Sequence, residues 1–266
     1  MARIILSAQN IDIYDGDGDD LFARTGAVSA EQVCKAGAEG VILGHSEVGD
    51  TLEVVAKKLQ TIIARGGEVA LLDRLTILVG ETWEEFESAL PQEIEERVRV
   101  HLASILHDIP ANYLTNLVVG YEPKWGSRGS GRDDMPPPAP EVISGVCRSL
   151  HDWLIDRFGR EAGDRIPLIY GGRSTPERTE QILTDENISG LILGSACNSV
   201  VKTMEIASAM SRAKPSGQKI LHANFKAYNL RDSYADYLRE LKILDDTFVI
   251  YLSPCHPDLR EIKALL

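Results

Sequence analysis

The sequence has few cysteines, and none of them is placed to form an obvious site. Its four cysteines, Cys34, Cys147, Cys197 and Cys255, are scattered through 266 residues, with no Cys-x-x-Cys pair and no metal-ligand spacing. They are expected to be reduced thiols that act as small core side chains. No metal site and no cofactor are expected.

Long apolar runs and an excess of basic charge are also missing. No stretch approaches the roughly 20 apolar residues that span a bilayer, and the apolar part of Met1–Ser7 is too short for a signal peptide. A cytoplasmic protein with no membrane partner is expected. Its 28 Lys and Arg against 40 Asp and Glu give a net charge of −12, which argues against nucleic acid as the main partner.

What the sequence does contain is a repeated alternation of two patterns. Short runs rich in Val, Ile and Leu are followed by a polar turn and then by a stretch with helical apolar spacing. The predicted strands are Ile4–Ala8, Gly40–Leu43, Leu75–Val79, Leu117–Tyr121, Pro167–Tyr170, Gly190–Leu193, Ile220–Phe225 and Thr247–Leu252. The predicted helices are Ala30–Ala36, Leu52–Arg65, Glu84–Leu106 with an interruption at Pro91, Glu141–Phe158, Pro176–Leu183, Val200–Ala213, Ser233–Leu244 and Asp258–Leu265.

The alternation predicts an α/β fold in which residues 1–266 form a single (β/α)₈ barrel domain. Parallel strands covered on both faces explain why the strand runs lack strict alternation. The first strand is not followed by Gly-x-Gly-x-x-Gly, which argues against a doubly wound sheet. Ser29 and Gln32 have capping-box spacing, and the acidic segment Asp15–Asp20 reads as a solvated loop rather than a calcium site.

Polar residues follow several strands at the end where a parallel barrel builds its active site. His45 and Glu47 follow the second strand, Glu122 follows the fourth, and Asn224 and Lys226 follow the seventh. Each alone has a structural explanation, as a core imidazole, an exposed carboxylate or a surface charge. A base, an electrophile and a cation together indicate one active site at the barrel mouth. Gln9, Asn10 and Glu81 end strands in the same way.

Glycine-containing turns follow two other strands. Gly171-Gly172-Arg173-Ser174 and Gly194-Ser195 let backbone N–H groups approach a phosphate, although a tight turn explains either one equally well. The segment Gly126–Arg132 has the composition of a mobile lid.

Taken together, these strings resemble triosephosphate isomerases over nearly the whole chain. Ala223-Asn224-Phe225-Lys226 is similar to the family's first strand, Ala8-Gln9-Asn10 to its third and Gly44-His45-Ser46-Glu47 to its fourth. Tyr121–Trp125 with Gly129–Arg132 is similar to the sixth strand and its lid, and Tyr170-Gly171-Gly172 and Gly190–Ser195 to the seventh and eighth. This order implies a circular permutation in which the chain starts at the family's third strand. Neighbouring strands of a closed barrel pair whether or not the chain joins them.

The resemblance implies interconversion of dihydroxyacetone phosphate and D-glyceraldehyde 3-phosphate without a cofactor. Glu122 would move the proton, a neutral His45 would polarise the carbonyl, Lys226 would offset developing negative charge and Asn224 would position the substrate. Glu47 would orient Lys226, although a plain salt bridge is an equally good reading. The phosphate would be bound by Gly129, Arg173, Ser174, Gly194 and Ser195.

Departures from the family pattern leave alternatives open. Arg173 stands where the family has serine and Ser174 follows it, so either the serine role moves or a guanidinium binds the anion. The alternatives are an isomerase of a larger sugar phosphate, such as a tetrulose phosphate, and a non-catalytic permuted barrel scaffold. A homodimer through the loop around Thr25-Gly26 is expected, although Ala27 replaces the acidic residue usual there.

Overall fold

Eight parallel strands close into a barrel in the computed structural model, which describes residues 1–13, 26–64, 74–126, 131, 134–227 and 233–266. The strands follow one another around the ring in chain order, and β1 pairs with β8 to close it. They are β1 (Arg3–Ala8), β2 (Gly40–Leu43), β3 (Arg74–Val79), β4 (Leu117–Tyr121), β5 (Leu168–Gly171), β6 (Ile188–Leu193), β7 (Lys219–Asn224) and β8 (Phe248–Ser253).

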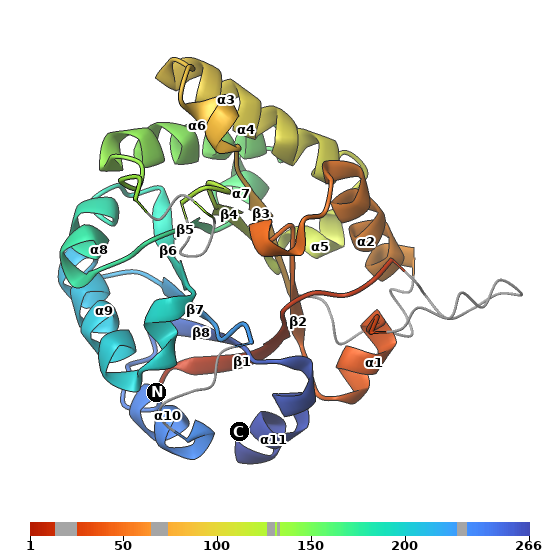
Figure 1. Ribbon diagram of the computed structural model, residues 1–266, viewed down its shortest axis with the longest axis vertical. Helices are drawn as coiled ribbons and strands as arrows, with labels where there is room; N and C mark the ends of the chain where they lie inside the picture. The colour runs from red at the N-terminus through yellow and green to blue at the C-terminus, as the bar shows by residue number, and fades with distance from the viewer. Residues whose placement is uncertain (14–25, 65–73, 127–130, 132–133, 228–232) are drawn as a thin grey trace, which may run out of the picture.

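Helices surround the ring of strands, as Figure 1 shows. They are α1 (Ala30–Lys35), α2 (Leu52–Ala64), α3 (Trp83–Phe86), α4 (Pro91–Leu106), α5 (Ala111–Leu114), α6 (Pro140–Phe158), α7 (Arg160–Gly163), α8 (Pro176–Ile182), α9 (Val200–Ala213), α10 (Tyr234–Leu241) and α11 (Leu259–Leu265). Three short 3₁₀ turns, η1 (Ser46–Val48), η2 (Ser195–Asn198) and η3 (His256–Asp258), follow strand ends.

The two faces of the barrel strands are buried in different clusters. Inside the barrel lies a small apolar cluster composed of Ile5, Ile42, Leu78, Val118, Ile169, Ile192, Ile220, Val249 and Tyr251. The alternate strand residues, such as Leu6 and Val119, pack with the helices in a much larger cluster. Because both faces are apolar, the strands read as continuous Val, Ile and Leu runs.

The predicted barrel and its eight strands are confirmed, with strand ends shifted by no more than two residues. The predicted interruption of Glu84–Leu106 at Pro91 is confirmed, because this stretch forms two helices, α3 and α4, and Pro91 takes the first position of the second. The predicted helix Ser233–Leu244 is shorter and ends at Leu241. The short helices α5 and α7 were missed, since four residues are too few to show a helical period.

Local capping follows the sequence signals. The Oγ of Ser29 accepts a hydrogen bond from the Gln32 backbone N–H at 3.2 Å, and the Gln32 side chain accepts one from the Ser29 backbone N–H at 2.9 Å. This is the predicted capping box of α1. Pro176 opens α8 behind Thr175, whose side chain caps the helix.

Contacts of both chain ends place them at the face of the barrel where the strands begin. The backbone N–H of Ala2 donates to the Leu244 carbonyl at 2.8 Å, just before β1. The last helix, α11, places Lys263 3.0 Å from Glu39, which directly precedes β2. Neither end therefore lies near the mouth formed by the strand C-termini.

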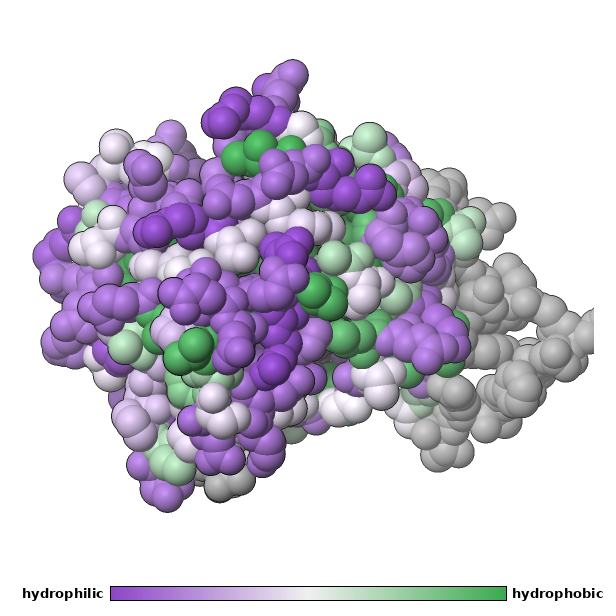
Figure 2. Space-filling view, turned by 90° about the horizontal axis from the view of Figure 1, so that it is seen from above, coloured by the Kyte–Doolittle hydropathy of each residue, from purple (hydrophilic) through white to green (hydrophobic). Residues whose placement is uncertain are grey.

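The outer surface is largely hydrophilic on the face displayed in Figure 2, with apolar residues in small separate patches. None of the helices within the described ranges combines the length and the apolar character needed to cross a membrane. The segments 14–25 and 65–73, which include the acidic stretch Asp15–Asp20, lie outside the described residues.

A fully buried imidazole lies inside the barrel on β7. The ring of His222 stacks on Tyr251 with centroids 5.1 Å apart, and its Nε2 lies 2.8 Å from the Ser253 hydroxyl. Burial, and to a smaller extent the nearby His45, lowers the pKa of His222 from 6.5 to about 3. The folded protein therefore holds this side chain neutral where an unfolded chain would protonate it.

We expect His222→Gln to flatten the acid dependence of stability. Between pH 6.5 and about 3 the unfolded chain binds a proton at His222 that the folded chain does not. The free energy of unfolding therefore decreases as the pH is lowered through this range. The slope from this one group is up to about 1.4 kcal/mol per pH unit. Urea unfolding at several pH values below 6.5 would measure it, and an unchanged slope in the variant would contradict the assignment.

Candidate active site

A carboxylate and an imidazole face each other at the mouth of the barrel. Glu122 follows β4 and is only 5% exposed. Its Oε1 lies 3.5 Å from Nε2 of His45, which follows β2. Ser46 binds the same carboxylate twice, through its hydroxyl at 2.9 Å and its backbone N–H at 3.1 Å. Glu122 is thus buried, held by two donors and in reach of the ring.

Two glycines make this approach possible. Gly44 precedes His45 with a φ of 85°, and a Cβ there would lie 2.3 Å from the Leu78 carbonyl oxygen. Gly80 packs against the backbone of Glu122, where a Cβ would lie 1.9 Å from the carbonyl oxygen. Neither position has space for a side chain.

The hydrogen bonding of His45 fixes which of its nitrogens carries the proton in the neutral ring. The backbone N–H of Glu47 donates to Nδ1 at 3.1 Å, so Nδ1 is an acceptor. A neutral imidazole has one N–H, which must then be at Nε2. That N–H faces the same space as the Glu122 carboxylate, where it can donate to an oxygen of a bound molecule.

The cation of the site is held from several sides. Lys226 is the only non-glycine residue with a positive φ, 51°, in the described part of the chain. Its backbone N–H donates to Oδ1 of Asn224 at 3.1 Å, and its ammonium is ion-paired with Glu47. From β1, the amide of Gln9 donates to the carbonyls of Lys226 at 2.8 Å and Ser253 at 3.0 Å. These contacts hold a left-handed backbone that an L residue rarely adopts.

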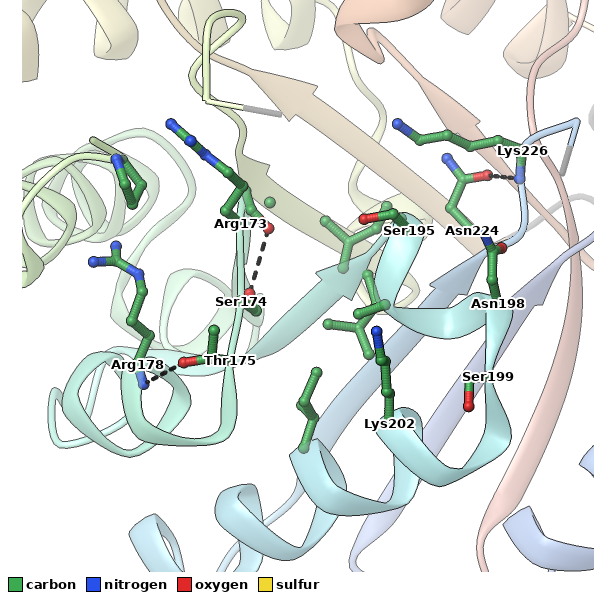
Figure 3. Close-up of a pocket in the computed structure, with 18 of the residues that line it drawn as sticks. Arg173, Ser174, Thr175, Arg178, Ser195, Asn198, Ser199, Lys202, Asn224 and Lys226 are labelled. Carbon is green, nitrogen blue, oxygen red and sulfur yellow. Dashed lines mark hydrogen bonds between the residues drawn. The ribbon is translucent and has the colours of Figure 1, made fainter. Parts of the chain in front are cut away.

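The strand-end turns after β5 and β6 line the same cavity, whose volume is about 800 Å³. Ser195 lies at the start of η2 and Ser174 in the turn that leads to α8, as Figure 3 shows. Gly194 directly precedes η2. The Arg173 guanidinium donates to the carbonyl of Met135, in the chain that returns from the segment after Glu122. Backbone donors and a guanidinium thus line one wall.

The structure brings most of the predicted site residues together. The cavity is lined by His45, Glu122, Arg173, Ser174, Gly194, Ser195, Asn224 and Lys226. Glu47 joins the group through Lys226, while Gly129 lies outside the described residues. In the described part of the chain, no three His, Cys, Asp or Glu side chains are placed to hold a metal ion.

Sequence reasoning missed the role of two residues. Ser46 lies inside the Gly-His-Ser-Glu string but was not recognised as a partner of Glu122. Glu81, a strand-end residue with no assigned role, is fully buried and accepts hydrogen bonds from Trp125 Nε1 at 3.0 Å and Tyr121 Oη at 3.2 Å. Burial raises its pKa.

Trp125 is held from both sides. It packs against the rings of Trp83 and Phe86, with centroids 5.0 and 4.5 Å away. Together with Glu81 these rings fix the backbone three residues after Glu122.

Fold and site together define a (β/α)₈-barrel protein with a buried carboxylate–imidazole pair and a lysine at the mouth of the barrel. The sequence model of the family described as "Triosephosphate isomerase" matches residues 1–210. The triosephosphate isomerase of Carboxydothermus hydrogenoformans is 32% identical over 199 residues, which cover 73% of this chain and 72% of that protein. That of Protochlamydia amoebophila is 32% identical over 210 residues, 78% of this chain and 73% of that protein. The chain belongs to the triosephosphate isomerase family.

We expect Glu81→Leu to destabilise the protein by about 2 kcal/mol or more, because it removes the acceptor that Tyr121 and Trp125 share in a buried place. Glu81→Gln keeps an acceptor oxygen at the same position and should lose much less. Urea unfolding of both variants at pH 7 measures the difference. Equal losses in the two variants would show that the shared hydrogen bonds contribute nothing.

Proposed function

We propose that this protein interconverts dihydroxyacetone phosphate and D-glyceraldehyde 3-phosphate without a cofactor. The observation that carries the proposal is the placement of Glu122 Oε1 3.5 Å from His45 Nε2, on the wall of a cavity that Lys226 also lines. A proton transfer next to a carbonyl needs a carboxylate base on the carbon and a donor on the oxygen.

In the forward direction, Glu122 takes a proton from the hydroxymethyl carbon next to the ketone. The electron pair of that C–H bond forms a carbon–carbon double bond, and the ketone oxygen takes up the negative charge. The Nε2–H of His45 stabilises this oxygen and can pass a proton to it, which gives an enediol. Glu122 then returns the proton to the neighbouring carbon, and Nε2 of His45, having given up its proton, takes the hydroxyl proton from the first oxygen, which becomes the aldehyde oxygen.

Lys226 and Asn224 act on the substrate from β7. The ammonium offsets the charge of the enediolate and of the phosphate, and the amide positions the substrate. Glu47 orients Lys226 by the ion pair already described. The burial of Glu122 supports this role for it, because little water reaches the place where the proton moves.

The phosphate of the substrate is bound on the wall formed after β5 and β6. Gly194 and Ser195 offer backbone N–H groups at the start of η2, and Arg173 and Ser174 face them from the other turn. Gly129 completes this set in the proposal.

We further propose that the chain is a circular permutation that begins at the family's third strand. The match to the family model ends at residue 210, which leaves β7 and β8 outside it, although β7 carries Asn224 and Lys226. A permuted order produces this pattern, because an alignment that follows the family's order cannot place its first two strands after its eighth. Closure of the ring by β1 and β8 is consistent with the same arrangement.

The proposal also covers the assembly and the cellular location of the protein. The protein acts as a cytoplasmic homodimer of single-domain subunits, with the loop around Thr25-Gly26 at the interface. Gly26 itself is exposed, with open space where a Cβ would be, which supports an interface at this position.

We expect Glu122→Gln to lower kcat by about 10²- to 10⁴-fold with a small change in KM, because the amide keeps the shape of the side chain but cannot take the proton. A coupled assay with dihydroxyacetone phosphate measures this. Glu261→Gln, on the exposed face of α11, is the matched control and should keep full activity. Equal turnover in wild type and Glu122→Gln would favour the non-catalytic scaffold.

The permutation is tested by moving the break in the chain. The rearranged protein begins at Gln218. A short Gly/Ser linker joins Leu266 to Met1, and the chain then ends at Gly217. We expect kcat/KM within about tenfold of the wild-type value, because both breaks lie just before strands, at the face opposite the site. A folded but inactive rearranged protein, judged by circular dichroism and the coupled assay, would contradict the proposal.

A further inference from the structure

A proline-rich segment leads from the mouth of the barrel into α6. Residues 135–140 read Met-Pro-Pro-Pro-Ala-Pro, and Pro140 takes the first position of α6. Proline has no backbone N–H, so Pro136, Pro137 and Pro138 cannot donate a backbone hydrogen bond. Hydrogen bonds can fix this stretch to the rest of the protein only through its carbonyl oxygens.

Two arginines donate to carbonyls of this proline segment, one near each of its ends. Nη2 of Arg173 donates to the Met135 carbonyl, and Nη2 of Arg178 donates to the Pro138 carbonyl at 2.9 Å. Figure 3 shows both guanidiniums on the side of the pocket away from Lys226. Hydrogen bonds from a charged donor are among the stronger ones in proteins. The segment is thus held by two charge-assisted bonds.

The turn that carries the two arginines is itself fixed. The Oγ1 of Thr175 accepts a hydrogen bond from the Arg178 backbone N–H at 3.3 Å, which caps α8 (Figure 3), and Pro176 takes the first position of that helix. The hydroxyl of the buried Tyr170 lies against Gly172, where a Cβ would be 2.2 Å from it. The two guanidiniums therefore start from a backbone with little freedom.

The anchored segment forms part of the cavity wall. Pro138 is buried, and Pro137 lines the cavity together with Ser174 and Ser195. The ring of Pro137 carries no donor and no charge, so it contributes shape and keeps water out of the cavity. A wall that is already in place needs no ordering when a ligand binds, which favours affinity.

We propose that Arg178 and Arg173 are positioning residues, which anchor the proline segment and thereby hold Pro137 in place as a wall of the phosphate-binding cavity. The inference rests on the proposed function, because it takes the phosphate of the substrate to be the ligand of this cavity. Arg173 serves in both roles, since a guanidinium has five N–H groups. Arg178 takes no part in the proton transfer, so its loss weakens binding and leaves the chemical step unchanged.

The test releases the anchor at Pro138 and leaves Arg173 unchanged. The variants are Arg178→Met, Arg178→Lys, which keeps a cationic donor, and Arg165→Met, the matched control. Arg165 is exposed and precedes β5, at the opposite end of that strand from the cavity. The measurements are KM and kcat for dihydroxyacetone phosphate in the coupled assay, and the Kd of inorganic phosphate by calorimetry.

We expect Arg178→Met to raise both the KM and the Kd of inorganic phosphate by about tenfold, the effect of one charge-assisted hydrogen bond. The kcat should stay within about twofold of the wild-type value, because the base and the imidazole are untouched. Arg178→Lys should recover most of the lost affinity, and Arg165→Met should behave like wild type.

Amide hydrogen exchange reports whether the segment has been released. The backbone N–H groups of Val142 and Ile143 donate to the carbonyl of Ala139, which directly follows Pro138, at 3.1 and 3.2 Å. Exchange at these two amides should be several-fold faster in Arg178→Met than in wild type, because the turn that they close begins at the released end of the segment.

Two results would overturn the proposal. Weaker phosphate binding with unchanged exchange in Arg178→Met would mean that Arg178 contacts the anion itself. Unchanged phosphate affinity, with or without faster exchange, would mean that the position of the proline segment does not affect binding. Loss of phosphate affinity together with faster exchange supports the anchor even in a protein that does not isomerise dihydroxyacetone phosphate, in which case the proposed function alone fails.

Discussion

Closure of the ring by the pairing of β1 with β8 is the constraint on which the site depends. The register runs from Arg3 opposite Val249 to Leu6 opposite Leu252, so the first and last strands lie side by side in parallel. All eight strands therefore direct their C-terminal ends toward one mouth. Glu122, His45 and Lys226 come from β4, β2 and β7, and only this closure gives them a common cavity.

The same seam also holds the cation in place. Gln9, just after β1, donates to the carbonyls of Ser253, at the end of β8, and of Lys226, two residues after β7. The left-handed backbone of Lys226 is thus supported across the point where the beginning and the end of the chain meet. The net charge of −12 does not oppose anion binding here, because the field inside a cavity is set by the nearest groups.

The strands and most helices could be predicted because their signals are local. The period of apolar residues marks each strand, and Ser29 with Gln32 marks the start of α1. Once the barrel was inferred from these local signals, the polar residues after the strands were predicted to meet at its mouth, because parallel strands end at the same face.

Contacts between distant segments could not be found in this way. The bonds from Ser46 to Glu122 and from Trp125 to Glu81, and the pairing of His222 with Ser253, depend on tertiary packing. Arg178 on α8 and Lys202 on α9 also line the cavity, and their placement was missed because an arginine or lysine on a helix looks like any solvated charge in the sequence.

The central claim is that Glu122 moves a proton between two substrate carbons, and isomerisation in deuterium oxide tests it most directly. A proton held on Glu122 in the enediol complex can exchange with solvent before it returns to carbon. The account predicts that glyceraldehyde 3-phosphate formed from dihydroxyacetone phosphate carries deuterium at its second carbon, detected by nuclear magnetic resonance. Product formed at the same rate with no deuterium at that carbon, and with none in the recovered dihydroxyacetone phosphate, would contradict the account.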